Sequence, residues 1–414
     1  MKKMKEMKNI QMKFRSMLAF MFFVSLSVAF TSCDKDDDDN NNDNNQSTGN
    51  EVISSNITEN TTWTSDKVYQ LGGRISVESG ATLTIEPGTI IKGEAGTGSN
   101  STALLIARGA KLMAEGTPSA PIIFTSVADE ITPQDVADGN FGSPNLDPDI
   151  DGLWGGVIVL GSAPISASND GGDVTEVQIE GIPTSDPNGL YGGNDAADNS
   201  GKLKYISIRH GGSNIGAGNE INGLTFGGVG NGTVVENIEV VANQDDGIEW
   251  FGGTVNVKNV VSWNVYDDAL DADQSWGGSV DNFVIITPDG HNFELDGPEG
   301  TYEDGYTIKN GIVVANSDSR SSGHLIDYDA NTITDLKNIS IRNIKQGQVI
   351  DIAPEDAPDV TFDEVYLDIP SGNLSDYITG GTVPAGVKEG KQDFADITVF
   401  NWTWAFQYGE LSNL

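Results

Sequence analysis

The amino-acid sequence predicts an all-β protein that folds as a single right-handed parallel β-helix with inserted loops and a C-terminal cap. From about Thr62 onward, short β-rich runs alternate with Gly, Asn and Asp, and no long segment has helical periodicity. Acidic segments and asparagines both recur with a period of 22 or 23 residues, which is about one coil of such a helix. A β-sandwich or a propeller is the main alternative, but its antiparallel strands would not require this period.

Residues 1–32 have the three parts of a secretory signal peptide. Basic residues extend to Arg15, an apolar run follows from Met17 to Val24, and small residues precede Cys33. The apolar run is too short for a membrane-spanning helix. We therefore expect that this segment directs export and is then removed.

Cys33 is the only cysteine in the chain. Thr31-Ser32-Cys33 resembles the lipobox of bacterial lipoproteins, which implies that Cys33 is acylated and begins the mature chain. The alternative is an unpaired thiol, which would be a reactive liability in an exported protein.

Behind Cys33, an acid-rich run from Asp34 to Asp39 and an Asn-rich tract predict a disordered tether over residues 33–60. The run resembles the export signal of Bacteroidota surface lipoproteins. That resemblance implies a lipid anchor in the outer membrane and a domain that faces the cell exterior.

The 414-residue chain has a formal net charge of −38, from 23 Lys and Arg against 61 Asp and Glu. Nucleic acid is excluded as a ligand, because its phosphates would find no basic surface. The charge favours cations, neutral glycans or a basic protein partner, and it also keeps a surface protein soluble.

Residues 61–414 supply the strands of the predicted β-helix. The clearest β-rich runs are Thr82–Ile85, Ala103–Ala107, Pro121–Thr125, Val157–Leu160, Leu203–Ile208, Val234–Val241, Val255–Val261 and Val280–Ile286. Two polar segments, Asp129–Asp151 and Ser168–Ser200, break the rhythm and are expected to be loops inserted between coils. The aromatic stretch from Phe394 to Phe406 is expected to cap the last coil against edge pairing, with an aromatic platform for glycans as the alternative.

Four asparagines mark a repeated corner. Asn237, Asn259, Asn282 and Asn310 lie in or just before strands at spacings of 22, 23 and 28 residues. Asparagine tolerates a left-handed backbone, and its side-chain amides can stack as a hydrogen-bonded ladder.

Acidic segments at 243–249, 266–273 and 290–296 predict a ladder of carboxylates on one face. Glu249 to Asp271 is 22 residues and Asp271 to Glu294 is 23 residues, so these acids would stack on successive coils. Strand alternation sends Ile248 and its equivalents into the core and the acids outward to solvent.

Such a ladder would bind Ca²⁺, which takes six to eight oxygen ligands. The cation would also offset the repulsion between like charges. The candidate ligands are Asp245, Asp246, Asp267, Asp268, Asp271, Asp273, Glu294 and Asp296. Trp250, Trp263 and Trp276 interleave with the acids and are candidates for stacking on sugar rings, although aromatic residues of this kind also fill cores.

Several coils resemble those of pectate-lyase-like, right-handed β-helix surface proteins. The resemblance rests on Leu83–Gly93, Ala114–Thr117, Pro121–Ser126, Gly152–Val157 and Leu203–Gly212. The whole chain is similar to a group of β-helix lipoproteins of Bacteroidota, which specifies the fold better than the function.

The order of acids also resembles the polygalacturonase-type glycoside hydrolases, which carry Asn-Thr-Asp, Asp-Asp and Gly-His-Gly on successive coils. By position, the resemblance implies catalytic roles for Asp246, Asp267, Asp268 and His291. Asn292 replaces the last glycine of that pattern, and Thr307-Ile308-Lys309 only partly matches the Arg-Ile-Lys that grips a substrate carboxylate. An inverting reaction would need carboxyl groups about 6.5–9.5 Å apart.

Three classes of function remain open from the sequence. The first is a surface lipoprotein that binds Ca²⁺, a glycan, or both. The second is a glycoside hydrolase or a polysaccharide lyase on an acidic polysaccharide, and a lyase would need a base such as Arg209, His210 or Lys258. The third is an accessory or scaffold subunit of an outer-membrane protein complex.

Overall fold

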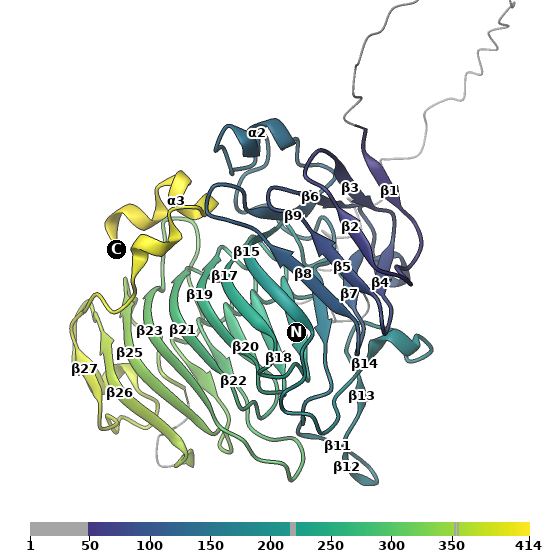
Figure 1. Ribbon diagram of the computed structural model, residues 1–414. Helices are drawn as coiled ribbons and strands as arrows, with labels where there is room; N and C mark the ends of the chain where they lie inside the picture. The colour runs from purple at the N-terminus through teal and green to yellow at the C-terminus, as the bar shows by residue number, and fades with distance from the viewer. Residues whose placement is uncertain (1–48, 216–220, 352, 354–355) are drawn as a thin grey trace, which may run out of the picture. The chain divides into compact units, whose positions relative to one another are not determined.

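Parallel strands dominate the fold (Figure 1). The computed structural model describes residues 49–215, 221–351, 353 and 356–414, so the signal peptide, Cys33 and most of the tether lie outside the described residues. One sheet, the long sheet, has 15 strands, and a second, the short sheet, has eight. The strands of both sheets pair in parallel with equivalent strands of neighbouring coils. The predicted single right-handed parallel β-helix is confirmed.

The long sheet contains β1 (Glu51–Ile53), β2 (Thr61–Trp63), β3 (Val68–Leu71), β5 (Thr82–Ile85), β6 (Ile90–Gly93), β8 (Lys111–Glu115), β9 (Ile122–Ser126), β15 (Gly201–Arg209), β17 (Val234–Val241), β19 (Asn256–Trp263), β21 (Ser279–Ile286), β23 (Tyr306–Val314), β25 (Thr334–Arg342), β26 (Val360–Leu367) and β27 (Val387–Glu389). The short sheet contains β4 (Arg74–Val77), β7 (Ala103–Ile106), β10 (Val157–Leu160), β16 (Leu224–Gly227), β18 (Ile248–Phe251), β20 (Leu270–Ala272), β22 (Glu294–Leu295) and β24 (Asp327–Tyr328).

Helices are few and short. In the part of the chain that the structure describes, the α-helices are α2 (Pro133–Ala137) and α3 (Trp404–Tyr408), and the 3₁₀ turns are η1 (Gly98–Asn100), η2 (Pro187–Gly189), η4 (Leu374–Tyr377), η5 (Ile397–Phe400) and η6 (Glu410–Asn413). Among the described residues, none of the helices combines the length and the apolar character needed to cross a bilayer.

The first strand forms earlier than predicted. β1 pairs in parallel with β3, with Glu51 opposite Tyr69, and Ile57 is buried in the core. Residues from Glu51 onward therefore belong to the fold, and the prediction of a disordered tether to residue 60 is wrong at that end. The apolar Ile53 and Ile57 explain the difference, because they add to the core.

Long strands bend where an asparagine adopts a left-handed backbone. Asn237, Asn259, Asn282 and Asn310 all have φ between 59° and 66°. The Asn259 amide donates to Asn237 at 3.0 Å, and the Asn282 amide donates to Asn259 at 2.8 Å. The predicted ladder is confirmed, and Asn338 extends it by donating to Asn310.

Tryptophans fill the interior rather than the surface. Trp250 and Trp276 are stacked with ring centroids 4.6 Å apart, and both belong to the main core cluster. Trp263 is buried beneath the C-terminal segment. The prediction that Trp250, Trp263 and Trp276 bind glycans is wrong, since no face of these rings is open to a sugar.

The C-terminal aromatic segment covers a side of the β-helix and not its last coil. Phe400, Trp404 and Leu411 pack on outward apolar residues of β17, β19 and β21, and the Ala405 amide donates to the buried Glu239 at 2.9 Å. In Figure 1, α3 lies apart from β27, which pairs with β26 at the far edge of the long sheet. The predicted position of the cap is therefore wrong. The outer faces of these strands are apolar, and burying this apolar surface stabilises the C-terminal segment in that position.

Both inserted loops lie between coils, as predicted. The first contains α2, and the second contains two antiparallel hairpins, β11 (Ala167–Asn169) with β12 (Gly172–Val174) and β13 (Val177–Gln178) with β14 (Leu190–Tyr191). The second loop reaches the outer face of the short sheet, where the Tyr191 hydroxyl accepts a hydrogen bond from Gln274.

Candidate functional site

A ladder of carboxylates runs along the outer face of the short sheet. The strand register places Glu249 opposite Asp271, Asp271 opposite Glu294, and Glu294 opposite Asp327. The first two steps are those predicted from the spacing. Asp327 is an additional rung, which the sequence period missed because an enlarged coil puts it 33 residues after Glu294.

A second column lies at the corner that precedes each strand of this sheet. The Asp268 amide donates to the Asp246 carboxylate at 2.9 Å, and the His291 amide donates to the Asp268 carboxylate. The structure thus stacks Asp246, Asp268 and His291 on successive coils, and His324 follows with its ring stacked on that of His291. Asp267 is exposed beside this column, and its carboxylate lies within 4.8 Å of those of Asp245 and Asp246.

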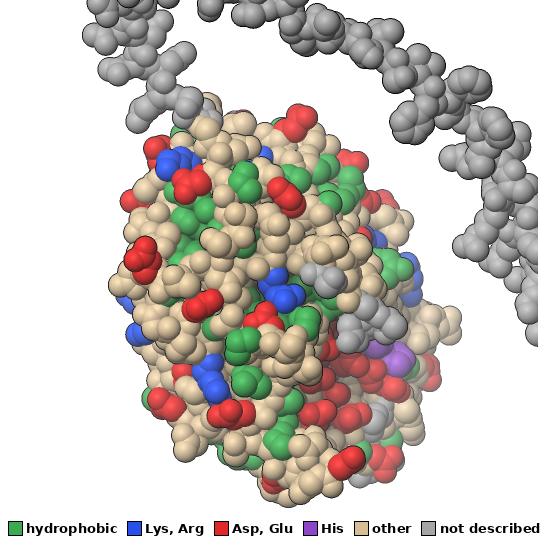
Figure 2. All heavy atoms as spheres, turned by 90° about the vertical axis from the view of Figure 1, so that its right-hand side faces the viewer, with side chains coloured by type: hydrophobic (Ala, Val, Ile, Leu, Met, Phe, Trp, Pro, Cys, Tyr) green, Lys and Arg blue, Asp and Glu red, His purple; other side chains and the backbone are tan. Residues whose placement is uncertain are grey.

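The acids form a hollow and do not simply face solvent. Figure 2 shows Asp and Glu side chains gathered in one recess together with histidine. Asp246, Glu249, Asp268 and Asp271 are only 2–7% exposed. They point away from the core as predicted, but the expectation that they face open solvent is wrong. The second inserted loop contributes to this environment, because Glu180 and Tyr191 interact electrostatically with Glu249.

Three of these carboxylates form a buried cluster. Oxygens of Asp246, Glu249 and Asp271 lie within 4.8 Å of one another. Burial, followed by repulsion from neighbouring carboxylates, raises the pKa of each well above its usual range. Asp271 Oδ1 and Asn222 Oδ1 are buried acceptors without hydrogen-bond partners, and the Asn222 amide donates to Glu249. This oxygen-rich set, which we call the buried triad, fits a hard cation.

Asp268, His291 and Glu294 form a second group whose pKa values are pushed apart. Burial alone would raise the pKa of Asp268, but hydrogen bonds from His291 and Glu294 outweigh it and lower the pKa. The hydrogen bond to Asp268 is also the main reason that the pKa of His291 rises and that of Glu294 rises to about 9. At neutral pH, Asp268 is therefore ionised and Glu294 protonated.

A third column continues the acidic surface. Burial and neighbouring carboxylates raise the pKa of Asp273 to about 7 and that of Asp296 to about 6. Neither residue joins a described group of three potential metal ligands, in contrast to the predicted ligands Asp245, Asp246, Asp267, Asp268, Asp271 and Glu294.

Histidines are the basic side chains that lie beside the ladder. Within the described ranges, the ion pairs that Glu249, Asp271, Glu294 and Asp327 make are limited to those of Asp327 with His291 and His324. Lys309, the partial counterpart of a uronate-gripping lysine, lies on the long sheet with its ammonium 3.5 Å from Asp281. The structure therefore does not place this lysine where a polyuronide would meet the ladder.

The candidate bases for a lyase also lie elsewhere. Arg209 and His210 are at most 1% exposed and pack against Trp404 of the C-terminal segment. Lys258 is on β19 of the long sheet. Arg209 and His210 form a packed pair that cannot reach a substrate, and none of the three residues lies on the short sheet that carries the acids.

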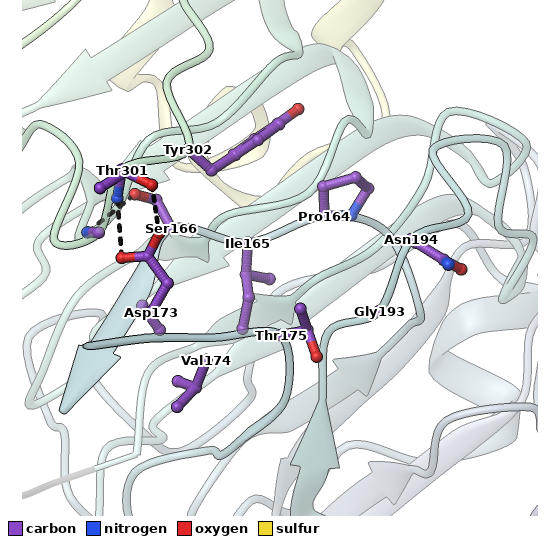
Figure 3. Close-up of a pocket in the computed structure, with 12 residues that line it drawn as sticks. Pro164, Ile165, Ser166, Asp173, Val174, Thr175, Gly193, Asn194, Thr301 and Tyr302 are labelled. Carbon is purple, nitrogen blue, oxygen red and sulfur yellow. Dashed lines mark hydrogen bonds between the residues drawn. The ribbon is translucent and has the colours of Figure 1, made fainter. Parts of the chain in front are cut away.

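A separate pocket opens between the second inserted loop and the segment that follows β22. It has a volume of about 470 Å³ and is lined by Pro164, Ile165, Ser166, Ala167, Asp173, Val174, Thr175, Gly193, Asn194, Gly300, Thr301 and Tyr302. Figure 3 shows Tyr302 reaching across this pocket above Ile165 and Pro164. The tyrosine is 37% exposed, and it was not among the predicted aromatic residues because no acidic repeat surrounds it.

A family model described as a pectate-lyase-like β-helix domain matches residues 55–371, which is well over half of the chain. No curated protein and no solved structure matches the sequence.

Proposed function

The chain belongs to the family of pectate-lyase-like β-helix domains, and on this premise we propose that it is a surface lipoprotein that binds Ca²⁺ in its acidic hollow. The fold is compatible with a glycoside hydrolase or lyase, but many functions share one fold, and the site has to decide. The observation that carries the proposal is the buried triad of Asp246, Glu249 and Asp271.

Three features of the triad favour a bound divalent cation. Its carboxylates are nine-tenths buried or more, where repulsion between ionised groups is costly. Two acceptor oxygens, Asp271 Oδ1 and Asn222 Oδ1, have no donor, and leaving such atoms unsatisfied costs about 1–3 kcal/mol each. A Ca²⁺ ion would satisfy the acceptors and offset the charge, with waters completing its coordination.

Calorimetric titration with Ca²⁺ and thermal unfolding with and without EDTA test this proposal. We expect EDTA to lower the melting temperature by several degrees, because Ca²⁺ at 100 times its dissociation constant stabilises the folded state by about 2.7 kcal/mol. The Glu249→Gln variant should lose both the heat of binding and the sensitivity to EDTA.

Asp363→Asn is a matched control, because Asp363 is an exposed acid on β26 of the long sheet. It should bind Ca²⁺ like the unchanged protein. A melting temperature that ignores EDTA in the unchanged protein would refute the proposal.

The pocket at Tyr302 is our candidate for glycan contact. Sugar rings stack on exposed aromatic faces, and about 470 Å³ lies within the usual range for small-ligand sites. Tyr302→Ala should abolish binding to those glycans that the unchanged protein retains on an array, while Tyr266→Ala should not. Tyr266 is the control because it is 56% exposed and does not line the pocket. Equal retention by both variants would remove the pocket from the proposal.

A glycoside hydrolase is the second candidate, and the ionised Asp268 beside a protonated Glu294 favours it. Their carboxyl groups share a hydrogen bond, so they lie closer together than the about 5–5.5 Å of retaining enzymes and much closer than the inverting geometry expected from the sequence. In this role Asp268 would attack the anomeric carbon while Glu294 protonates the leaving oxygen.

Release of reducing sugars from pectins, alginates and sulfated glycans tests catalysis. Activity that disappears in Asp268→Asn, with Ca²⁺ binding at the triad retained, would establish the hydrolase. A protein that binds Ca²⁺ but releases no reducing sugars would contradict the hydrolase proposal and support the binding function.

The cellular placement rests on Cys33 and the acid-rich run behind it. We propose that acylation of Cys33 holds the protein in the outer membrane, facing outward, where it contacts a polysaccharide or an outer-membrane protein complex as an accessory subunit. Cys33→Ala should release the protein into soluble fractions, and co-purification with membrane proteins would identify a complex. Retention of Cys33→Ala in membranes would contradict the lipid anchor.

A further inference from the structure

We propose that the rim of the hollow holds a second metal site, for a divalent transition ion of the Zn²⁺ class, formed by His291, His324 and Asp327. This site is separate from the buried triad, and its nitrogen donors distinguish it from a Ca²⁺ site. Imidazole and carboxylate together suit Zn²⁺ and its neighbours, whereas Ca²⁺ takes oxygen ligands.

The donor atoms converge at distances that suit a bridging ion. His291 Nε2 lies 3.7 Å from Asp327 Oδ2, and His324 Nδ1 lies 3.5 Å from the same oxygen. One donor atom from each of these three side chains lies within 4.8 Å of the other two, and a bound water would supply the fourth ligand. Ligands of a tetrahedral Zn²⁺ with bonds of about 2.0–2.2 Å are separated by roughly 3.3–3.6 Å. The observed gaps are too long for good hydrogen bonds but close to that separation.

The second nitrogen of His291 faces a carboxylate, which orients the ring toward the site. His291 Nδ1 lies 3.1 Å from the buried Asp268 carboxylate, and metal-binding histidines almost always direct their second nitrogen to such a partner. His324 Nδ1 is shielded from solvent and has no hydrogen-bond partner.

Backbone stacking explains why two imidazoles meet at this corner. The rings of His291 and His324 lie on neighbouring coils with centroids 5.0 Å apart and planes 21° apart. Gly323 permits the approach, because a Cβ at that position would lie only 3.3 Å from His291 Nε2. One nitrogen of each ring lies within 4.8 Å of the other and of a carboxylate oxygen of Asp327, which belongs to the ladder.

Zn²⁺ titration of the purified protein in saturating Ca²⁺ tests the site. We expect one equivalent of Zn²⁺ to bind, and binding should weaken at least tenfold in His324→Gln. His324 is half-exposed, so this variant should keep its fold and its Ca²⁺ binding. Glu249→Gln should lose Ca²⁺ but keep Zn²⁺, so that failure of the Ca²⁺ proposal and failure of this one give different results.

Two further measurements remove the remaining ambiguities. Cys33 is the only thiol and His210, the third histidine, is fully buried, so Cys33→Ser should leave the Zn²⁺ titration unchanged. Co²⁺ bound to the unchanged protein should show the intense visible absorption of a tetrahedral site with nitrogen ligands. Absence of Zn²⁺ binding, equal binding by His324→Gln, or displacement of Zn²⁺ by millimolar Ca²⁺ would each overturn the proposal.

Discussion

At the scale of single residues, burial decides what each side chain of the acidic segments can do. Glu249 and Asp271 stack as their spacing predicts, yet both are at least nine-tenths buried. A carboxylate in that setting must be protonated, paired or bound to a cation. Trp250, only a residue away from Glu249, points inward and belongs to the core.

Replacing one carboxyl group of the buried triad should stabilise the protein when no cation is present. In Asp271→Asn, the amide keeps the shape of the side chain but ends its repulsion with Glu249, so we expect the melting temperature in EDTA at pH 7.5 to rise by a few degrees. In Ca²⁺ the same variant should melt below the unchanged protein, because a ligand is lost. A fall in both conditions would show that Asp271 is not repelled by its neighbours.

Replacing a core tryptophan should act on stability and not on ligands. Trp250→Ala removes a ring that stacks on Trp276, and such changes cost about 3–5 kcal/mol. Urea unfolding should show this loss, while glycan retention per folded molecule stays unchanged. A loss of glycan binding without a loss of stability would instead support the prediction that the tryptophans contact glycans.

At the scale of elements, the bends of the long strands depend on asparagine for two separate reasons. Asn259 has a φ of 59°, which other non-glycine residues adopt at a cost, and its amide bridges Asn237 and Asn282. One residue type thus supplies both the left-handed turn and the hydrogen bonds that tie three coils together.

Two substitutions at this position should separate the two contributions. Asn259→Gly loses the two hydrogen bonds but keeps the backbone relaxed, and we expect a loss of about 1–2 kcal/mol. Asn259→Ala adds strain and should lose roughly 1 kcal/mol more. Urea unfolding measures both, and equal losses would mean that the backbone angle carries no cost.

At the scale of the unit from Thr48 to Leu414, the chain is acidic and concentrates acids in one hollow. A group with a raised pKa binds its proton more tightly in the folded state, so its contribution to stability falls as pH rises between its unfolded and folded pKa values. Asp273 and Asp296 have an ordinary pKa of 3.8 and folded values of about 7 and about 6.

The stability of the metal-free protein in EDTA should therefore fall as pH rises from about 4 to about 7. The raised pKa of His291 acts in the same direction above pH 6.5. Thermal unfolding in EDTA across this range measures the slope, and the Asp273→Asn, Asp296→Asn double variant should flatten it. A slope that the double variant does not change would assign the effect to other groups.

The sequence by itself determined the parallel β-helix, the positions of its main strands and the register of Glu249, Asp271 and Glu294. A coil of fixed length stacks equivalent residues, so a period of 22 or 23 residues predicts which residues of neighbouring coils are in contact. The asparagine ladder followed for the same reason.

Only the tertiary structure decided which acids are buried, where the aromatic segment lies and which residues complete the site. Three features join segments far apart in the chain: the inserted loop near Glu249, the packing of α3 on β17, β19 and β21, and the approach of His324 and Asp327 to His291. The local sequence pattern does not predict such contacts. They depend on where the irregular coils and loops place the backbone, and the repeat does not specify those positions.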